Sequence, residues 1–168
     1  MVAAVSNVLF ATIRLARMAL PMRVRVVAVA PHESVHIAIA RMLEEGIGSV
    51  AVCDGPRLVG IFTERDVLRL SGHSSDLSEL TVETVMTRNP VTISPEADVL
   101  DAAQLMYDRG IRHLPVVEGE NLLGMLGIRE VLRTLVERLW QTHDPEFHDR
   151  ARELLERRPE VSSPPQGV

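Results

Sequence analysis

The chain repeats itself with a period of 64 residues. Residues 27–69 align with residues 91–133 without a gap, and 15 of the aligned pairs are identical. Two unrelated segments of this length would share about three residues at ordinary amino-acid frequencies. The identical pairs include Pro31 and Pro95, Val35 and Val99, Met42 and Met106, Gly46 and Gly110, and Gly60 and Gly124. The chain is therefore an internal duplication, and both copies are expected to share one fold.

Each copy predicts the same order of elements, which is strand, helix, strand, strand, helix. Short runs rich in β-branched residues predict strands, and apolar residues at helical spacing predict helices. The elements are expected at 24–30, 34–45, 50–53, 58–62 and 64–70 in the first copy, and at 91–94, 98–109, 114–117, 122–126 and 128–141 in the second. Pro31 and Pro95 are expected in the first turn of the following helix, and Gly46 and Gly110 at the helix C-caps.

The predicted fold class is α+β. A single copy, with about 50 residues, buries too little surface to be secure alone. Two β-α-β-β-α repeats packed sheet-to-sheet as a pseudo-two-fold pair solve this problem and leave clefts at the seam. Because 46% of the residues are hydrophobic and only 3% are aromatic, the core is expected to consist of aliphatic side chains and Met. The charged segment 144–158 predicts an additional C-terminal helix.

Composition and the N-terminal residues bear on location and partners. The net charge of −5 gives no reason to expect a nucleic-acid partner. Arg14 and Arg17 interrupt the apolar segment 1–20, which predicts neither a membrane-spanning helix nor a signal peptide. The single cysteine, Cys53, is expected to be an unreactive residue buried in a strand. We therefore expect a cytoplasmic protein.

Motifs in both copies carry a resemblance to a known family. They are Gly46–Val52 and Gly60–Asp66 in the first copy, and Met86–Val91, Gly110–Val117 and Gly124–Glu130 in the second. On these residues the chain resembles the CBS domain family, whose tandem pairs form a Bateman module. Val82–Met86 looks like the short helix that precedes a repeat, and Val5–Leu9 looks like its counterpart.

The resemblance divides the chain into four parts. The first repeat is expected at 5–71 and the second at 80–136. A helical extension is expected at 137–158, followed by a disordered tail rich in Pro and Ser at 159–168. Trp140 and Phe147 are two candidates for fastening the extension, either to the body of the protein or to a second subunit.

The family binds adenosine-containing ligands such as AMP, ADP, ATP or S-adenosylmethionine between two repeats. Its signature, Gly-hydrophobic-x-Thr/Ser-x-x-Asp, is intact at Gly60–Asp66. The resemblance implies that Asp66 accepts hydrogen bonds from ribose hydroxyls and that Thr63 bonds ribose or phosphate. By position it adds to the site Gly48, Ser49, Asn89, Pro90, Val91, Ile111, Arg112 and His113. Val91 and Ile111 would enclose a purine, and Arg112 or His113 would meet phosphate.

Two readings of the signature stay open. Thr63 and Asp66 also have the spacing of a capping box, in which an N-cap Thr and an acidic residue three positions later stabilise a helix start. The second copy departs from the signature, because it has Gly127 in place of the Thr and Glu130 in place of the Asp. At most one good nucleotide site is therefore expected. Because Gly48 and Ser49 supply no cation, AMP is favoured over a triphosphate as the ligand.

No pattern in the sequence indicates an enzyme or a metal protein. His32 and His36 have a spacing that metal ligands use, but no third ligand is near in sequence, so a solvated helix face is expected. His143 and His148 lie in a charged segment and are not expected to bind metal or to act in catalysis. Phosphate-binding glycine loops, nucleophile elbows and Cys-x-x-Cys pairs do not occur in the sequence.

The leading hypothesis is a non-catalytic regulatory module that binds an adenosine-containing ligand and has no obligatory cofactor. The resemblance implies a homodimer formed through the helices, and the module would act on an unidentified regulated protein. One alternative is a structural or interaction protein with an empty cleft. A nucleic-acid-binding protein is a third hypothesis, and the acidic composition counts against it.

Overall fold

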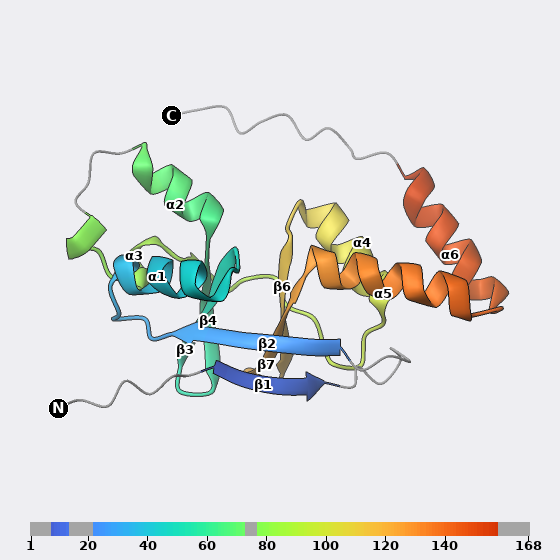
Figure 1. Ribbon diagram of the computed structural model, residues 1–168, viewed down its shortest axis with the longest axis horizontal. Helices are drawn as coiled ribbons and strands as arrows, with labels where there is room; N and C mark the ends of the chain where they lie inside the picture. The colour runs from blue at the N-terminus through green and yellow to red at the C-terminus, as the bar shows by residue number, and fades with distance from the viewer. Residues whose placement is uncertain (1–7, 14–21, 73–76, 158–168) are drawn as a thin grey trace.

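The computed structural model describes residues 8–13, 22–72 and 77–157 (Figure 1). The elements in the first half are β1 (Val8–Ile13), β2 (Met22–Val29), α1 (Val35–Glu45), β3 (Ser49–Asp54), β4 (Arg57–Thr63), α2 (Glu64–Ser71), the 3-10 helix η1 (Leu77–Glu79) and α3 (Val82–Val85). They are followed by β5 (Thr87–Arg88), α4 (Val99–Arg109), β6 (His113–Glu118), β7 (Asn121–Gly127), α5 (Ile128–Gln141) and α6 (Pro145–Glu156).

The duplication predicted from the sequence is present in the backbone. Helices α1 and α4 both have 11 residues and start 64 positions apart. Both end at a glycine in the left-handed region, Gly46 with φ 61° and Gly110 with φ 59°. The hairpins β3–β4 and β6–β7 have the same register, and each has its irregularity at the same place, after Val52 and after Val116. The predicted α+β pair of repeats is therefore confirmed.

One strand is shorter in the second copy than in the first. β2 pairs in parallel with β3 at two positions, whereas the expected strand at 91–94 forms only a bridge between Ile93 and Val116. Pro115 explains the difference, because it has no N–H to extend the parallel ladder toward Val91. Its counterpart in the first copy is Ala51, which pairs with Ala28.

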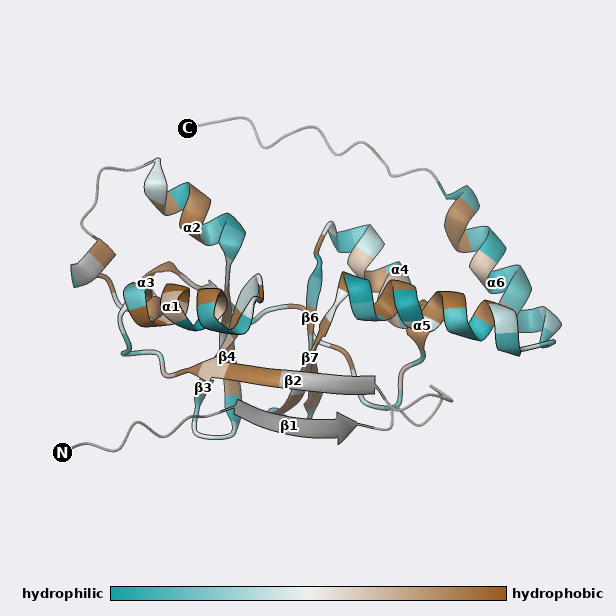
Figure 2. Ribbon diagram, viewed as in Figure 1, coloured by the Kyte–Doolittle hydropathy of each residue, from teal (hydrophilic) through white to brown (hydrophobic). Residues whose placement is uncertain are grey.

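The strands of the two copies are joined into one path, β1-β2-β3-β4-β7-β6, with β5 attached to β4. The two copies meet through β4 and β7, where Arg57 pairs with Asn121, and through β2 and β7, where Arg25 pairs with Met125. In Figure 1, helices α1, α4 and α5 lie on one side of β2, and β1 lies on the other. Helices α1 and α5 alternate between apolar and polar segments (Figure 2), as helices that bury one face do.

Each repeat has its own hydrophobic core. In the first, Val35, Ala38 and Met42 of α1 pack against Val50, Val52 and Phe62 of the hairpin. In the second, the counterparts Val99, Ala102 and Met106 pack against Leu114, Val116 and Leu126. Apart from Phe62 and Phe147, the buried apolar side chains are aliphatic or Met, as the composition predicts.

Two expectations about helix starts were wrong. Pro31 and Pro95 lie in turns three residues before the N-caps, which are Ser34 and Asp98. In the first copy the carbonyl of Pro31 accepts a hydrogen bond from the N–H of Glu83, so this turn also holds the first turn of α3. The short helix expected at 82–86 is present as α3.

The prediction of a helix at 5–9 was also wrong for residues 8 and 9, which are the ones that the structure describes. Val8 and Leu9 belong to strand β1, which pairs antiparallel with β2 along its whole length. Residues 5–7 lie outside the described residues, as does the whole of the expected tail at 159–168. The run Val8–Ile13 is apolar and partly β-branched, so it suits an extended strand beside β2.

The C-terminal helix α6 is part of the second repeat. It lies within the predicted segment 144–158, with Asp144 as its N-cap and Pro145 in its first turn. Phe147 is only 3% exposed and belongs to the core of repeat 2, whereas Trp140 is 84% exposed. The guanidinium of Arg138 lies 4.4 Å above the ring of Phe147. Phe147 therefore fastens the extension to the body, and α5 continues unbroken across the expected boundary at 136.

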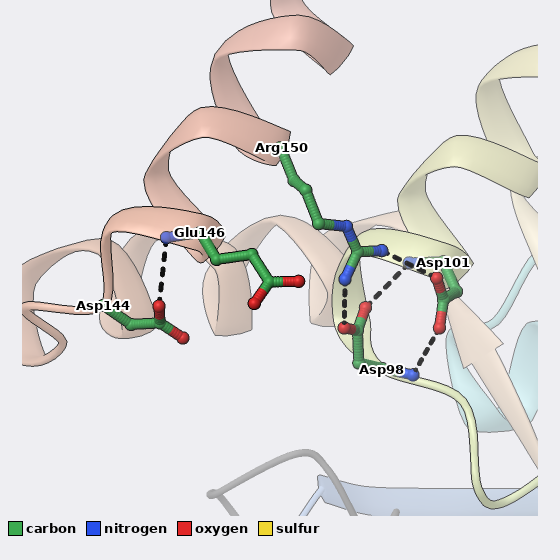
Figure 3. A network of polar contacts seen from close by, with 5 residues as sticks. All are labelled: Asp98, Asp101, Asp144, Glu146 and Arg150. Atoms are coloured by element: carbon green, nitrogen blue, oxygen red, sulfur yellow. Dashed lines mark hydrogen bonds and ion pairs between the residues drawn. The ribbon is translucent and has the colours of Figure 1, made fainter.

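Arg150 ties α6 to the start of α4 (Figure 3). Its two Nη atoms each lie 2.8 Å from a carboxylate oxygen, one from Asp98 and one from Asp101. Asp98 and Asp101 also accept hydrogen bonds from each other's backbone N–H groups, in a reciprocal capping box. Burial favours the neutral form of Asp98, but the Asp101 N–H and the Arg150 guanidinium outweigh it and lower the pKa of this carboxyl.

Candidate functional site

A cleft of about 220 Å³ lies at the seam between the repeats, and we call it the first cleft. Repeat 1 contributes Gly48, Ile61, Thr63, Glu64, Arg65, Asp66 and Arg69, and the following half contributes Thr87, Pro90, Val91, Ile111, Arg112 and His113. Eight of the ten residues predicted for the ligand site therefore line one cleft. The antiparallel pairing of β5 with β4, in which Ile61 lies opposite Thr87, brings the start of the second half beside the end of β4.

Asp66 is the buried acid of the first cleft, at 6% exposure. One of its oxygens accepts hydrogen bonds from the backbone N–H of Thr63 at 2.9 Å and from the Thr63 hydroxyl at 2.7 Å. The other oxygen lies 3.3 Å from a guanidinium nitrogen of Arg69. The Thr63–Asp66 pair therefore stabilises the start of α2, and the same carboxylate lines the cleft.

Apolar side chains form the walls beside this acid. Ile61 comes from the strand that leads into α2, and Val91 and Ile111 come from the second repeat. Val91 and Ile111 are partly buried and pack against the core of repeat 2. Apolar walls near one buried acceptor suit a ligand with an aromatic base and a hydroxylated sugar.

Two predicted site residues lie outside the lining of the first cleft. Ser49 is buried and lines the neighbouring cleft instead. Asn89 is exposed, with a positive φ of 48°, and its backbone N–H donates to the carbonyl of Val59. Its side chain type suits that left-handed backbone position, which Asn tolerates better than most residues.

The neighbouring cleft, of about 440 Å³, is the pseudo-two-fold counterpart, and we call it the second cleft. A shift of 64 residues places Gly127 at the position of Thr63 and Glu130 at the position of Asp66. The carboxylate of Glu130 occupies the space that a side chain on Gly127 would fill. The second cleft therefore has an acid, Glu130, but no hydroxyl group at the position that corresponds to Thr63.

Four residues, Gly48, Glu64, Arg112 and His113, line both clefts. His113 is half-buried at their junction. Burial and the positive charge of Arg112 lower the pKa of His113, and Glu64 and Glu130 oppose this shift. The imidazole is therefore neutral at pH 7.

Sequence reasoning missed three charged residues of the first cleft, Glu64, Arg65 and Arg69. Arg69 follows Asp66 by three positions, a spacing that places two helical side chains side by side. This spacing was a signal that could have assigned Arg69 to the site. Glu64 had no such signal, because its role depends on contacts with a loop of the same repeat and with the second repeat.

The sequence singled out two histidines and one cysteine outside the ligand site. His32 and His36 are exposed, and the described residues contain no group of three or more His, Cys, Asp or Glu that could hold a metal ion. Cys53 lies in strand β3 as expected, but it is partly rather than fully buried, and this burial raises the pKa of its thiol to about 11. Within the described part of the chain, no helix is long and apolar enough to cross a membrane.

A sequence profile of the CBS domain family matches residues 16–73 and 82–137. The chain belongs to the CBS domain family. These two matched segments contain every residue of the first cleft, so both repeats of this CBS pair build the site. The matches end at residue 137, before α6 begins.

Known CBS proteins similar to this one differ in length. A mitochondrial CBS domain-containing protein of Arabidopsis thaliana, CBSX3, is 37% identical over 112 residues, which are 62% of this chain and 53% of that protein. An uncharacterised 17.7 kDa protein of Acidianus ambivalens is 32% identical over 132 residues, 77% of each chain. The CBS pair thus spans about half the length of the plant relative.

Among solved structures, that of CBSX2 in complex with AMP has a TM-score of 0.60 and 27% identity to this CBS pair. The alignment covers 67% of this chain and 88% of that one. CBS pairs of this kind are generally regulatory and often dimerise.

Proposed function

We propose that this CBS pair is a non-catalytic regulatory module that binds one adenosine-containing ligand in the first cleft. The ligand would be AMP, ADP, ATP or S-adenosylmethionine. Asp66 would accept hydrogen bonds from the ribose hydroxyls, and Val91 and Ile111 would enclose the purine. Arg112 would meet a phosphate. A ligand held by both repeats favours the arrangement that fits it, which is how binding would reach a regulated protein.

The observation that carries this proposal is the convergence of both repeats on Asp66. The buried carboxylate from the first repeat lies in one cleft with apolar walls from the second. Hydrogen bonds from neutral donors to a buried carboxylate are stronger than those between neutral groups, so a ribose gains affinity there. The AMP complex of the similar protein CBSX2 supports the choice of ligand class.

A second candidate function follows from the hydrogen bonds of Asp66 itself. Its carboxylate is already satisfied by Thr63 and Arg69, so it would stabilise α2 in an empty cleft. The module would then be a structural or interaction protein. Titration of the full chain with the four ligands in a calorimeter separates the two: saturable binding supports the sensor, and absence of binding by all four supports the structural protein.

We also propose that the module forms a homodimer through its helices. Leu68 on α2 is 72% exposed, and its counterpart Leu132 on α5 is 53% exposed. Val136 and Leu139 extend the exposed apolar side of α5 from Leu132. A second copy that covers both leucines would remove this apolar surface from water.

The double variant Leu68→Glu, Leu132→Glu is expected to be a monomer where the unmodified chain is a dimer, because two charges would be buried in the interface. Sedimentation velocity at micromolar concentration measures this. Leu155→Glu is the matched control, since Leu155 is 82% exposed but lies on α6. A dimer that persists in the double variant, or a monomeric parent chain, would contradict the proposed interface.

A further inference from the structure

The two clefts have one wall in common, which we call the shared wall. Gly48, Glu64, Arg112 and His113 line both clefts, whereas Asp66, Val91 and Ile111 line only the first. A ligand with its base between Val91 and Ile111 and its ribose on Asp66 therefore extends toward this shared wall with its remaining atoms. In a nucleotide those atoms are phosphates.

Glu64 places a carboxylate on this wall. A Cβ built on Gly48 would lie 2.9 Å from Oε2 of Glu64 and 3.2 Å from Cε1 of His113. The carboxylate therefore occupies the space that the missing side chain of Gly48 leaves. The backbone N–H of Glu64 donates to the carbonyl of Gly48 at 3.0 Å, which holds the start of α2 against this loop.

The charges on the shared wall cancel. Glu64 contributes one negative charge and Arg112 one positive charge, and His113 is neutral at pH 7 because burial and Arg112 lower its pKa. Of the other cations of the first cleft, Arg69 is already paired with Asp66, and Arg65 is exposed and lies outside the shared wall. One phosphate can be matched by Arg112, but each further phosphate faces Glu64 without a free cation on the wall.

The second repeat has no such acid at the equivalent position. A shift of 64 residues places Ile128 opposite Glu64 and Arg112 opposite Gly48. The same backbone contact is kept, since the N–H of Ile128 donates to the carbonyl of Arg112 at 2.9 Å. The backbone contact therefore forms without a carboxylate at this position, which leaves the side chain of Glu64 available to act on a ligand in the cleft.

We propose that Glu64 is a specificity-determining residue of the first cleft, which accepts an adenosine ligand with one phosphate and disfavours di- and triphosphates. The inference rests on the proposed function and adds the residue that selects among nucleotides. A carboxylate within about 5 Å of an additional phosphate, in a partly solvated cleft, changes affinity by about tenfold.

Calorimetric titration with AMP and with ATP, in the absence of Mg²⁺, tests this proposal. The unmodified chain is expected to bind AMP at least about tenfold more tightly than ATP. Glu64→Gln keeps the shape and removes the charge, and it is expected to reduce this preference by about tenfold, mainly by tightening ATP binding. Glu64→Ile, which copies the second repeat, should do the same.

Glu130→Gln is the matched control. It removes one carboxylate near His113 from the second cleft, and the preference for AMP should stay within about twofold of the parent value. AMP binding with the same AMP-to-ATP preference in the parent and in both Glu64 variants would overturn the role of Glu64 and leave the proposed function standing. Absence of binding of either nucleotide to the parent chain would overturn the role of Glu64, and the proposed function falls with it only if ADP and S-adenosylmethionine do not bind either.

Discussion

Asp66→Ala is expected to lower the affinity of the first cleft for AMP by roughly a hundredfold. Asp66 is 6% exposed, and its carboxylate would accept hydrogen bonds from two ribose hydroxyls in place of those from Thr63, while it keeps its ion pair with Arg69. Each hydrogen bond to a charged group contributes about 1.5–3 kcal/mol, so two together exceed a hundredfold before the cost of releasing Thr63. Calorimetric titration of parent and variant measures the change.

The capping role of Asp66 makes a control necessary. Loss of a cap destabilises a helix by about 1 kcal/mol, so the variant should melt a few degrees lower and still be folded at 25 °C. Glu130→Ala, at the equivalent position of the second repeat, should leave AMP affinity unchanged. If Asp66→Ala lowers only the melting temperature and AMP binds as before, the acid is a helix cap and not a ribose acceptor.

Phe147→Ala is expected to reduce the free energy of unfolding by about 3–5 kcal/mol, the usual cost of truncating a buried Phe. Phe147 is 3% exposed, and it packs with Ala151 and the apolar side chains of repeat 2. Its removal would leave a cavity under α6 and take away the ring beneath Arg138. Chemical denaturation followed by circular dichroism measures this loss.

Trp140→Ala is the matched control for this prediction. Trp140 is the other large aromatic of the extension, and at 84% exposure it should change stability by less than about 0.5 kcal/mol in the monomer. Equal losses for the two variants would contradict the assignment of Phe147 as the residue that fastens α6. A loss below about 1 kcal/mol for Phe147→Ala would do so as well.

The 64-residue repeat accounts for most of what could be predicted. Because the two copies align without a gap, their helices and strands have the same spacing. An element predicted in one copy therefore also predicts its counterpart in the other. Helix α5 at Ile128–Gln141 has the predicted bounds, and α1 and α4 differ from theirs by one residue at the start. Gly46 and Gly110 were predictable C-caps because the left-handed conformation favours glycine.

The errors arose where a local sequence rule allows two positions for a helix start, or where long-range pairing determines the element. Pro31 and Pro95 fit a first helical turn by rule, but the true N-caps, Ser34 and Asp98, are also good capping residues. The segment Val5–Leu9 resembled a preceding helix by position, and the pairing of Val8 and Leu9 with β2 depends on long-range contacts that no local pattern records.

The candidate site was predictable in its position and less so in its charges. Thr63 and Asp66 stand in a motif, and the repeat indicates which segments of the second copy face them. The choice between Trp140 and Phe147 and the position of Glu64 could not be predicted, because each depends on which side of a helix meets a distant segment. The difference between the two clefts was visible in Gly127 and Glu130.

Calorimetric titration of the full chain with AMP tests the central claim most directly, because it reports both binding and stoichiometry. The predicted result is one saturable site per chain, since only the first cleft joins the Thr63–Asp66 pair to apolar walls from the other repeat. The result that would contradict the account is no binding by AMP, ADP, ATP or S-adenosylmethionine, or two equivalent sites per chain.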